Sequence, residues 1–281
     1  MKWSKVVTKV ESIDVDTFKT MLAESSAGSY VLIDVRQPAE YAKSHIPGAV
    51  SMPMNDLIEG NVTLPDPKPI IVYSRQGGRS KAAVQWFVSQ DFQDVKEIEG
   101  GFDSWTGNRA SGQFDLNIGI IRQDVEFPDA VSMAYAMEEG LRQFYLEIAR
   151  ETVDETYKKL YRKLASFEVE HKQALADSYS IASGKELIEK ELQEKQVQLL
   201  EGGGYADETL IKTLANTDSP YEVFSLAIAF ETQAFDFYLR LSQYATNPEA
   251  KKFFLEMADA EKEHLAFVTK EMDKYLDQHQ P

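Results

Sequence analysis

Two four-residue segments, Glu168-Val169-Glu170-His171 and Glu261-Lys262-Glu263-His264, decide the fold of the second half of this 281-residue chain. Both read E-x-x-H, and the second follows the first by 93 positions. At the same offset, Glu138 recurs as Glu231. Because residues three apart on a helix share a face, each Glu and His pair is predicted to point toward one site. The shared offset indicates an internal repeat.

Each copy of the repeat is predicted to be a pair of antiparallel helices. Glu138 and Glu168 each lie about 14 residues from a break at 151–154, so at about 1.5 Å per residue they are equally far from the turn. Thr152 is predicted to cap the helix that follows the break. The second copy repeats this spacing around a turn at 245–248. Two such hairpins predict a four-helix bundle with its acidic residues in one layer.

A bundle of this kind needs one long connection between its hairpins. Residues 185–200 form a charged, amphipathic segment, and Gly202-Gly203-Gly204 follows it. We therefore predict a crossover helix over 185–200 that ends at these glycines.

Four carboxylates and two imidazoles would meet in the predicted layer. Four carboxylates in an apolar core cannot all stay ionised without compensating positive charge, and two divalent metal ions would supply that charge. Mixed carboxylate and imidazole ligands suit iron or manganese better than a metal that prefers thiolates. The predicted metal ligands are Glu138, Glu168, His171, Glu231, Glu261 and His264.

With this ligand pattern, residues 125–275 resemble the rubrerythrin and ferritin-like di-iron family. The resemblance implies a ferritin-like four-helix bundle over 125–281 and two iron ions, with manganese as the alternative metal. The implied roles are terminal ligation by Glu138 and Glu231, bridging by Glu168 and Glu261, and one nitrogen ligand per metal from His171 and His264.

The same resemblance implies a function. Members of this family reduce peroxide or oxidise ferrous ions, usually in defence against oxygen. We therefore expect a di-iron carboxylate oxidoreductase that acts on peroxide or dioxygen. The family also implies a homodimer.

Two further features of this half bear on the expected site. Tyr145 and Tyr238 lie two helical turns from Glu138 and Glu231, so they are predicted to donate hydrogen bonds to the ligands, with plain core packing as the alternative. Rubrerythrins carry a further Glu where this chain has Ala234, and a cysteine-bound iron that this cysteine-free sequence cannot form. An external electron donor is therefore expected.

The first 110 residues alternate short apolar strands with helices. The predicted strands are 30–35, 49–52, 69–73 and 95–99, and the predicted helices are 38–43, 80–90 and a final helical turn at 102–106. This alternation indicates an α/β domain with a parallel sheet, whose ligands bind beyond the carboxyl ends of the strands. We expect this domain to span 1–110, and a linker that contains Gly112 and Gly119 to span 111–124.

Motifs in this region resemble those of the rhodanese family. They are Leu32-Ile33-Asp34-Val35-Arg36, His45-Ile46-Pro47-Gly48-Ala49, Gly78-Arg79-Ser80 and Glu99-Gly100-Gly101-Phe102. In that family the first residue of a six-residue loop is the nucleophile, a cysteine that carries sulfur as a persulfide. Ser74 occupies this catalytic position here, and a serine hydroxyl cannot carry out persulfide chemistry. We therefore predict a rhodanese-like domain that is catalytically inactive.

The remainder of the loop is predicted to keep a cradle of backbone N–H groups at a helix start, where a small anion can bind. The predicted anion-binding residues are Arg75, Gln76, Gly77, Gly78 and Arg79. A well-formed turn without a ligand is the alternative interpretation. Ser74 has two explanations, a natural loss of the cysteine or the replacement of a natural cysteine, and the sequence leaves both open.

Composition narrows the remaining classes of function. The net charge of −16 argues against nucleic acid and anionic membranes as partners. The absence of cysteine excludes disulfides and thiolate metal sites. We expect a cytoplasmic protein, because no apolar run is long enough to span a bilayer and no signal-peptide core follows the first residues.

Two other functions stay open beside the di-iron oxidoreductase. One is a sulfurtransferase in which Ser74 replaces a natural cysteine, with the bundle as its redox partner or sensor. The other is a non-enzymatic protein that stores or senses metal.

Overall fold

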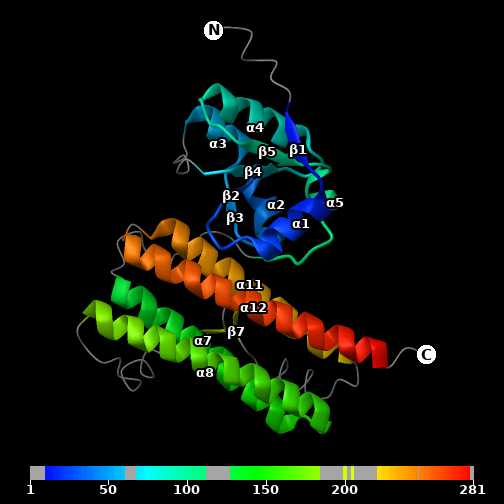
Figure 1. Cartoon of the computed structure of the whole chain (residues 1–281), viewed down its shortest axis with the longest axis vertical. Coiled ribbons are helices and arrows are strands. Elements are labelled where there is room, and N and C mark those ends of the chain that lie inside the picture. Colours follow the sequence, from blue (N-terminus) through cyan, green and yellow to red (C-terminus); the bar gives the residue numbers. More distant parts are fainter. Residues whose placement is uncertain are drawn as a thin grey trace.

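An α/β domain lies against one side of a helical bundle in the computed structural model of the chain (Figure 1). The domain packs on the hairpin of α11 (Pro220–Tyr244) and α12 (Pro248–Gln278), and the hairpin of α7 (Phe127–Glu151) and α8 (Glu155–Ser183) lies on the far side. The residues that the structure describes are 10–60, 68–111, 127–183, 199–200, 204–205, 220–245 and 247–278.

The α/β domain is built on a parallel sheet with the strand order β1-β5-β4-β2-β3. Its strands are β1 (Glu11–Ile13), β2 (Val31–Asp34), β3 (Ala49–Ser51), β4 (Ile70–Tyr73) and β5 (Val95–Ile98). Its helices are α1 (Val15–Glu24), α2 (Pro38–Lys43), α3 (Met54–Glu59), α4 (Gly78–Ser89) and α5 (Gly101–Ser104). The predicted α/β fold with its parallel sheet is confirmed.

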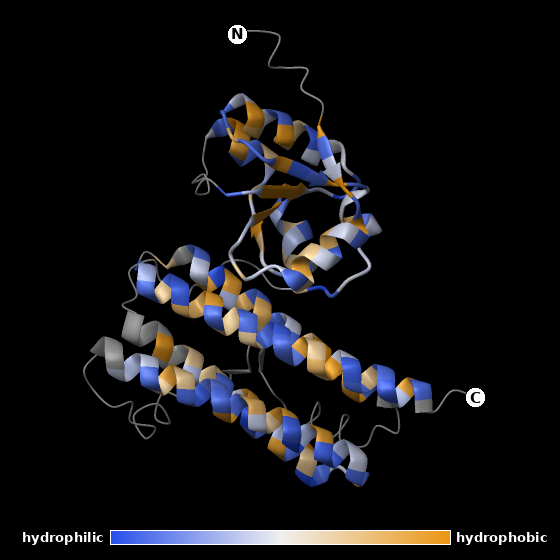
Figure 2. Ribbon diagram, viewed as in Figure 1, coloured by the Kyte–Doolittle hydropathy of each residue, from blue (hydrophilic) through white to orange (hydrophobic). Residues whose placement is uncertain are grey.

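Each face of the sheet has its own apolar core, because side chains along a strand alternate between faces. Leu32 and Ile71 pack on one face with Phe18, whereas Ile33 and Val72 pack on the other. Figure 2 shows hydrophobic residues concentrated in the middle of the sheet, and hydrophobic and hydrophilic residues alternating along the long helices. The alternation fits helices that bury one face.

Three elements of this domain are absent from the sequence-based prediction, namely β1, α1 and α3. β1 has only three residues and is largely exposed, so it carries no apolar alternation. The start of α1 does have a signal, because the Asp14 carboxylate accepts a hydrogen bond from the Thr17 N–H at 2.9 Å.

The predicted helical bundle is confirmed, but the cap at its first turn is not the predicted one. The Thr152 hydroxyl bonds backward to the Ile148 carbonyl at 2.8 Å, at the end of α7. Asp154 caps α8 instead, because its Oδ1 accepts the Thr156 and Tyr157 N–H groups at 2.7 and 3.1 Å. The prediction was wrong because either residue type can cap a helix, and the sequence alone did not place the first turn.

The crossover between the hairpins differs from its prediction where the structure describes it. Leu199–Leu200 forms β6, which pairs antiparallel with Gly204–Tyr205 as β7. The predicted end of a helix at these residues is therefore wrong. The rest of that helix, 185–198, lies outside the described residues, as does the predicted linker from 112 onward. Among the described residues, no helix has the length and apolar character that a membrane span requires.

A buried carboxylate joins the two domains. Asp236 on α11 accepts a hydrogen bond from the Gly48 N–H at 2.8 Å and lies 3.3 Å from Nε2 of His45. Its Oδ2 also forms an ion pair with Nε of Arg240 at 2.8 Å. All of these side chains are buried. Gly48 is needed here, since its φ is +78° and a Cβ would lie 2.4 Å from Leu239.

Candidate metal centre and the Ser74 loop

The four long helices bring all six predicted metal ligands into one layer of the bundle. α7 supplies Glu138, α8 supplies Glu168 and His171, α11 supplies Glu231, and α12 supplies Glu261 and His264. The four carboxylates are at most 1% exposed, and His171 is 4% exposed. Such buried charged groups require compensation.

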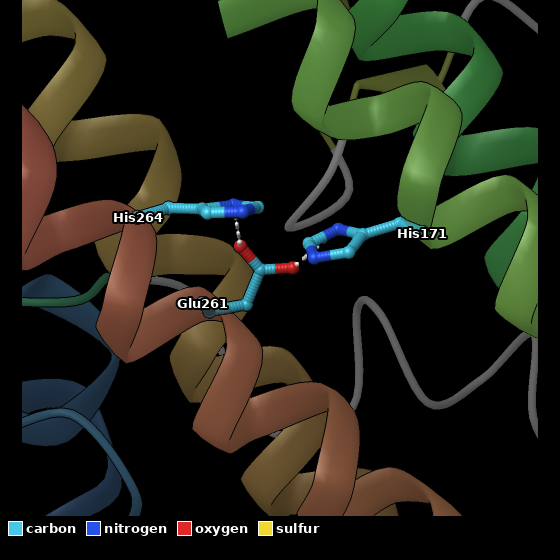
Figure 3. Close-up of side chains that lie close together, drawn as sticks. All are labelled: His171, Glu261 and His264. Atoms are coloured by element: carbon cyan, nitrogen blue, oxygen red, sulfur yellow. Dashed lines mark ion pairs between the residues drawn. The ribbon is translucent and has the colours of Figure 1, made fainter.

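Glu261 lies at the middle of this layer. Its Oε1 is 3.1 Å from Nδ1 of His171, and its Oε2 is 3.6 Å from Nδ1 of His264 (Figure 3). Glu138 approaches His171 at 3.3 Å, and Glu231 approaches His264 at 3.5 Å. The two hairpins therefore share one cluster, in which a carboxylate of α12 reaches the histidine of α8.

The two imidazole rings stack against each other. Their centroids are 4.6 Å apart and their planes differ by 22°, while Phe167 stacks on the other side of His264 at 4.2 Å. The packing fixes both rings and keeps their Nδ1 atoms directed at carboxylates.

Burial and neighbouring charges change the pKa values of the side chains in the cluster. Burial alone would lower the pKa of His171, but the charges of Glu261 and Glu138 raise it to about 12. Burial also opposes a charge on His264, whereas Glu231 and Glu261 raise its pKa to about 9. Burial raises the pKa of Glu231 to about 7. Burial opposes ionisation of Glu261 as well, but His171 and His264 lower its pKa to about 2.

The donor atoms of this cluster could hold a metal ion. Two groups of side chains, Glu138 with Glu168 and His171, and His171 with Glu261 and His264, each have ligand atoms within 4.8 Å of one another. Among the described residues, Nε2 of His171, Oε2 of Glu231, both carboxylate oxygens of Glu261 and Nδ1 of His264 are buried without a hydrogen-bond partner. Unsatisfied buried oxygen and nitrogen atoms that converge are what a metal site requires.

Tyr145 and Tyr238 both contact ligand carboxylates, and each contacts the opposite hairpin. The Tyr238 hydroxyl on α11 donates to Oε1 of Glu138 on α7. The Tyr145 hydroxyl on α7 lies 3.4 Å from Oε1 of Glu231 on α11. The spacing in the sequence suggests that each tyrosine donates a hydrogen bond to the glutamate of its own helix. In the structure each hydroxyl instead contacts the glutamate of the opposite hairpin.

Sequence reasoning missed a charged network beside the ligands. Glu139 pairs with Arg142 at 2.6 Å on α7 and with Lys172 of α8. Burial opposes ionisation of Glu139, but the hydrogen bonds from Arg142 and Lys172 lower its pKa to about 2. The signal was present, since Glu139 follows Glu138 and Lys172 follows His171, which places opposite charges at one level of the hairpin.

The loop that begins at Ser74 is packed tightly beneath α4 and α5. Ser74 is fully buried, and its Oγ accepts the Gly77 N–H at 3.2 Å and lies 3.4 Å from Oγ of Ser80. The Ser74 carbonyl accepts the Phe102 N–H at 2.8 Å. Gly101 permits this approach, because its φ is +61° and a Cβ would lie 2.2 Å from that carbonyl oxygen.

The cations of the loop already have carboxylate partners. Arg79 forms an ion pair with Glu40 at 2.8 Å, and this pair lowers the pKa of Glu40 to about 2. Arg75 lies 3.4 Å from Asp103, which also accepts a hydrogen bond from the Gln76 amide. The backbone N–H groups are therefore the main donors left for the predicted anion.

A buried carboxylate also lies under the loop. Glu97 is 1% exposed and accepts a hydrogen bond from Oγ of Ser80 at 2.8 Å. A Cβ on Gly77 would lie 3.4 Å from Oε2 of Glu97. Glu97 also pairs with Lys81 at 3.6 Å, and its carboxylate oxygens add no donor for an anion at the loop.

The comparisons with known proteins bear first on the α/β domain. The family model described as a rhodanese-like domain matches residues 15–108. A sulfurtransferase of Allochromatium vinosum is 30% identical over 96 residues, which cover 34% of this chain and 88% of that protein. The chain belongs to the rhodanese-like family. The thiosulfate sulfurtransferase GlpE of Pseudomonas syringae is 33% identical over 75 residues, which cover 27% of this chain and 71% of that protein.

A solved structure resembles the α/β domain, and a second family model matches part of the bundle. The crystal structure of the Alr3790 protein from Anabaena sp. has 29% identity and a TM-score of 0.34, and the match covers 38% of this chain and 85% of that one. The family model described as rubrerythrin matches residues 222–280, which include most of α11 and all of α12. A rhodanese-like domain is thus joined to a helical bundle whose second hairpin matches the rubrerythrin model, and α7 and α8 lie outside the matched residues.

Proposed function

We propose that the helical bundle holds two iron ions and acts as a di-iron carboxylate oxidoreductase, which reduces peroxide or oxidises ferrous ions. The observation that carries the proposal is the single buried layer of four carboxylates and two imidazoles, drawn from all four helices. The rubrerythrin match supports it, because that family implies a di-iron site. Manganese is the alternative metal, since the same ligand types suit it.

The proposed ligand roles follow from where the side chains lie. Glu138 and Glu231 are held by tyrosine hydroxyls of the opposite hairpin, which suits terminal ligands with fixed orientation. Glu261 reaches both histidines, which suits a bridging ligand. Glu168 is the proposed second bridge by its equivalent place in the repeat.

Apolar neighbours of the layer and the two proposed irons suit it to redox chemistry. Leu141, Phe144 and Ala227 belong to a buried apolar core of the bundle, and Leu141 and Ala227 lie about one helical turn from Glu138 and Glu231. Two ferrous ions, when bound, would supply the two electrons that convert one hydrogen peroxide and two protons into two water molecules. The chain has no cysteine for a second, thiolate-bound redox metal, so an external donor is proposed to return the electrons.

For the rhodanese-like domain we propose that sulfur is not transferred while Ser74 occupies the nucleophile position. The Ser74 hydroxyl is buried, and it is a poor nucleophile without an adjacent base. Relatives named as sulfurtransferases favour a second candidate, in which a cysteine at this position makes the domain a sulfurtransferase. The codon for position 74 in the source genome separates the two, because only the second candidate requires a cysteine there.

Peroxide-dependent oxidation of the ferrous protein tests the proposal. The full chain is loaded with ferrous iron without oxygen, mixed rapidly with hydrogen peroxide, and followed by the ferric absorbance. Glu261→Ala should abolish rapid oxidation. Glu263→Ala is the matched control, because Glu263 lies in the same segment but is exposed, and it should react like the native chain. If the native chain binds two irons that peroxide does not oxidise, the bundle is a storage or sensing site.

A further inference from the structure

A cavity of about 470 Å³ lies where the two domains meet. The rhodanese-like domain contributes the loop 25–28 after α1, together with parts of β2 and β3, and the bundle contributes α11 and α12. The volume lies within the range of small-molecule sites, which often occur at domain interfaces. The cavity is separate from both the metal ligands and the Ser74 loop, since none of those residues lines it.

The charge of the lining is unusual for this protein. Three lysines, Lys68, Lys251 and Lys262, border the cavity, and the lining includes no Asp or Glu among the described residues. The chain as a whole has a net charge of −16. A cavity whose charged side chains are all positive therefore differs in charge from the protein as a whole. Asp259 is 3.8 Å from Nζ of Lys262, but it is not part of the lining. An anion would find an attractive potential here.

Two of the ammonium groups are held in place by backbone carbonyls. Nζ of Lys68 donates to the Gly28 carbonyl at 2.6 Å, and Nζ of Lys262 donates to the Ser25 carbonyl at 2.6 Å. An ammonium group has three N–H donors, and these hydrogen bonds to described residues use one donor of each lysine. Because these side chains are already ordered, binding sacrifices less of their conformational entropy.

The remaining walls are largely apolar. Leu22, Leu32, Phe235, Leu239 and Leu255 border the cavity. An inorganic ion would leave this apolar surface in contact with water, whereas a ligand with a hydrocarbon or aromatic body would cover it.

The walls are also fixed relative to each other. The Ala27 N–H donates to Asp259 of α12 at 2.9 Å, and the Gly48 N–H donates to Asp236 of α11 at 2.8 Å. Ala27 and Gly48 both line the cavity, so the two bonds tie the domains together at its walls and favour a preformed site.

We propose that this cavity binds a small organic anion with an apolar body, of the class of medium-chain or aromatic carboxylates. The lysine ammonium groups bind the carboxylate, and the leucine and phenylalanine side chains cover the body of the ligand. The site does not depend on metal in the bundle, and it stands whether or not the proposed oxidoreductase function is correct.

Calorimetric titration of the full chain with octanoate tests the proposal. We expect saturable binding of octanoate, and at least about tenfold weaker binding of octanol, which has the same body without the charge. Inorganic phosphate, which has charge without the body, should also bind at least about tenfold more weakly. Lys68→Met with Lys251→Met should weaken octanoate binding by about tenfold or more, whereas Lys252→Met, an exposed neighbour outside the lining, should leave it unchanged.

A second measurement locates the ligand. Octanoate should slow amide hydrogen exchange in the loop 25–28, in β3 and along 239–255, and Ser26→Trp at the rim should block binding. The proposal is overturned if octanoate does not bind saturably, if octanol or phosphate binds as well, or if the lysine double variant binds like the native chain. Protection confined to other parts of the chain would overturn it too.

Discussion

Loading of the metal-free bundle with ferrous iron should release protons, in a number that depends on pH. In the structure, the pKa of His171 is about 12 and that of His264 is about 9, so both imidazoles carry a proton at neutral pH. The pKa of Glu231 is about 7, so this carboxyl is about half protonated there. Glu261 is ionised, because its pKa is about 2. Metal ligation requires neutral imidazole and ionised carboxylate, so these protons must leave.

The size of the release follows from these values. At pH 7, one proton from each histidine and half a proton from Glu231 give about 2.5 protons per chain. At pH 6 the Glu231 carboxyl is mostly protonated and the release rises to about three, whereas at pH 8 it falls to about two. The release decreases as pH rises because Glu231 loses its proton to solvent before the metal arrives.

Calorimetry in buffers of different ionisation enthalpy measures this number directly. The full chain is titrated without oxygen at pH 6 and pH 8, to saturation with ferrous iron. Glu231→Gln is the control: its amide has no proton to lose, so at pH 6 its release should be about one proton smaller than that of the native chain. A release below about one proton per chain at pH 6 would contradict this prediction, since the imidazoles would then not be protonated before the metal binds.

Three further predictions concern single side chains. Asp236→Ala should destabilise the chain by about 3–5 kcal/mol, because it leaves a buried guanidinium without its partner; denaturant unfolding measures the change. Tyr238→Phe should weaken metal binding by about tenfold to a hundredfold, because Glu138 loses its hydrogen bond; competition with a chelator measures the affinity. Ser74→Cys should give thiosulfate-dependent formation of thiocyanate, whereas the native chain should form none above the buffer control.

Control variants distinguish these specific effects from a general loss of stability. Asp259→Ala also removes a hydrogen bond between the domains, but its carboxylate is partly exposed, so its effect should be only about 1 kcal/mol. Tyr161→Phe removes a buried hydroxyl that has no partner among the described residues, so metal affinity should not change. Equal losses from Asp236→Ala and Asp259→Ala, or from the two tyrosine variants, would contradict the roles assigned here. Thiocyanate formation by the native chain would contradict the inactive domain.

The layer of six side chains could be predicted from the sequence because the spacing of residues along a helix determines which of them share a face. A separation of three residues fixes that Glu261 and His264 share a face, and an offset of 93 places the second copy in register with the first. The alternating strands of the sheet were recognisable for a similar reason, since a run of apolar residues of four or five marks a buried strand.

Contacts between distant segments could not be predicted in the same way. Tyr238 contacts Glu138 and Tyr145 contacts Glu231, each on the opposite hairpin. These contacts depend on how the hairpins pack, which the spacing of residues within one helix does not determine. The pairing of Arg79 with Glu40 spans 39 positions, and that of Asp236 with Gly48 spans 188. Nothing in the sequence near Asp236 indicates that it faces another domain.

Anomalous scattering at the iron edge, from crystals of the iron-loaded protein, tests the central claim most directly. We expect two iron peaks in the layer between α7, α8, α11 and α12, one bound by His171 and the other by His264, with Glu261 contacting both. No iron peak in that layer, or iron bound only at other side chains, would contradict it.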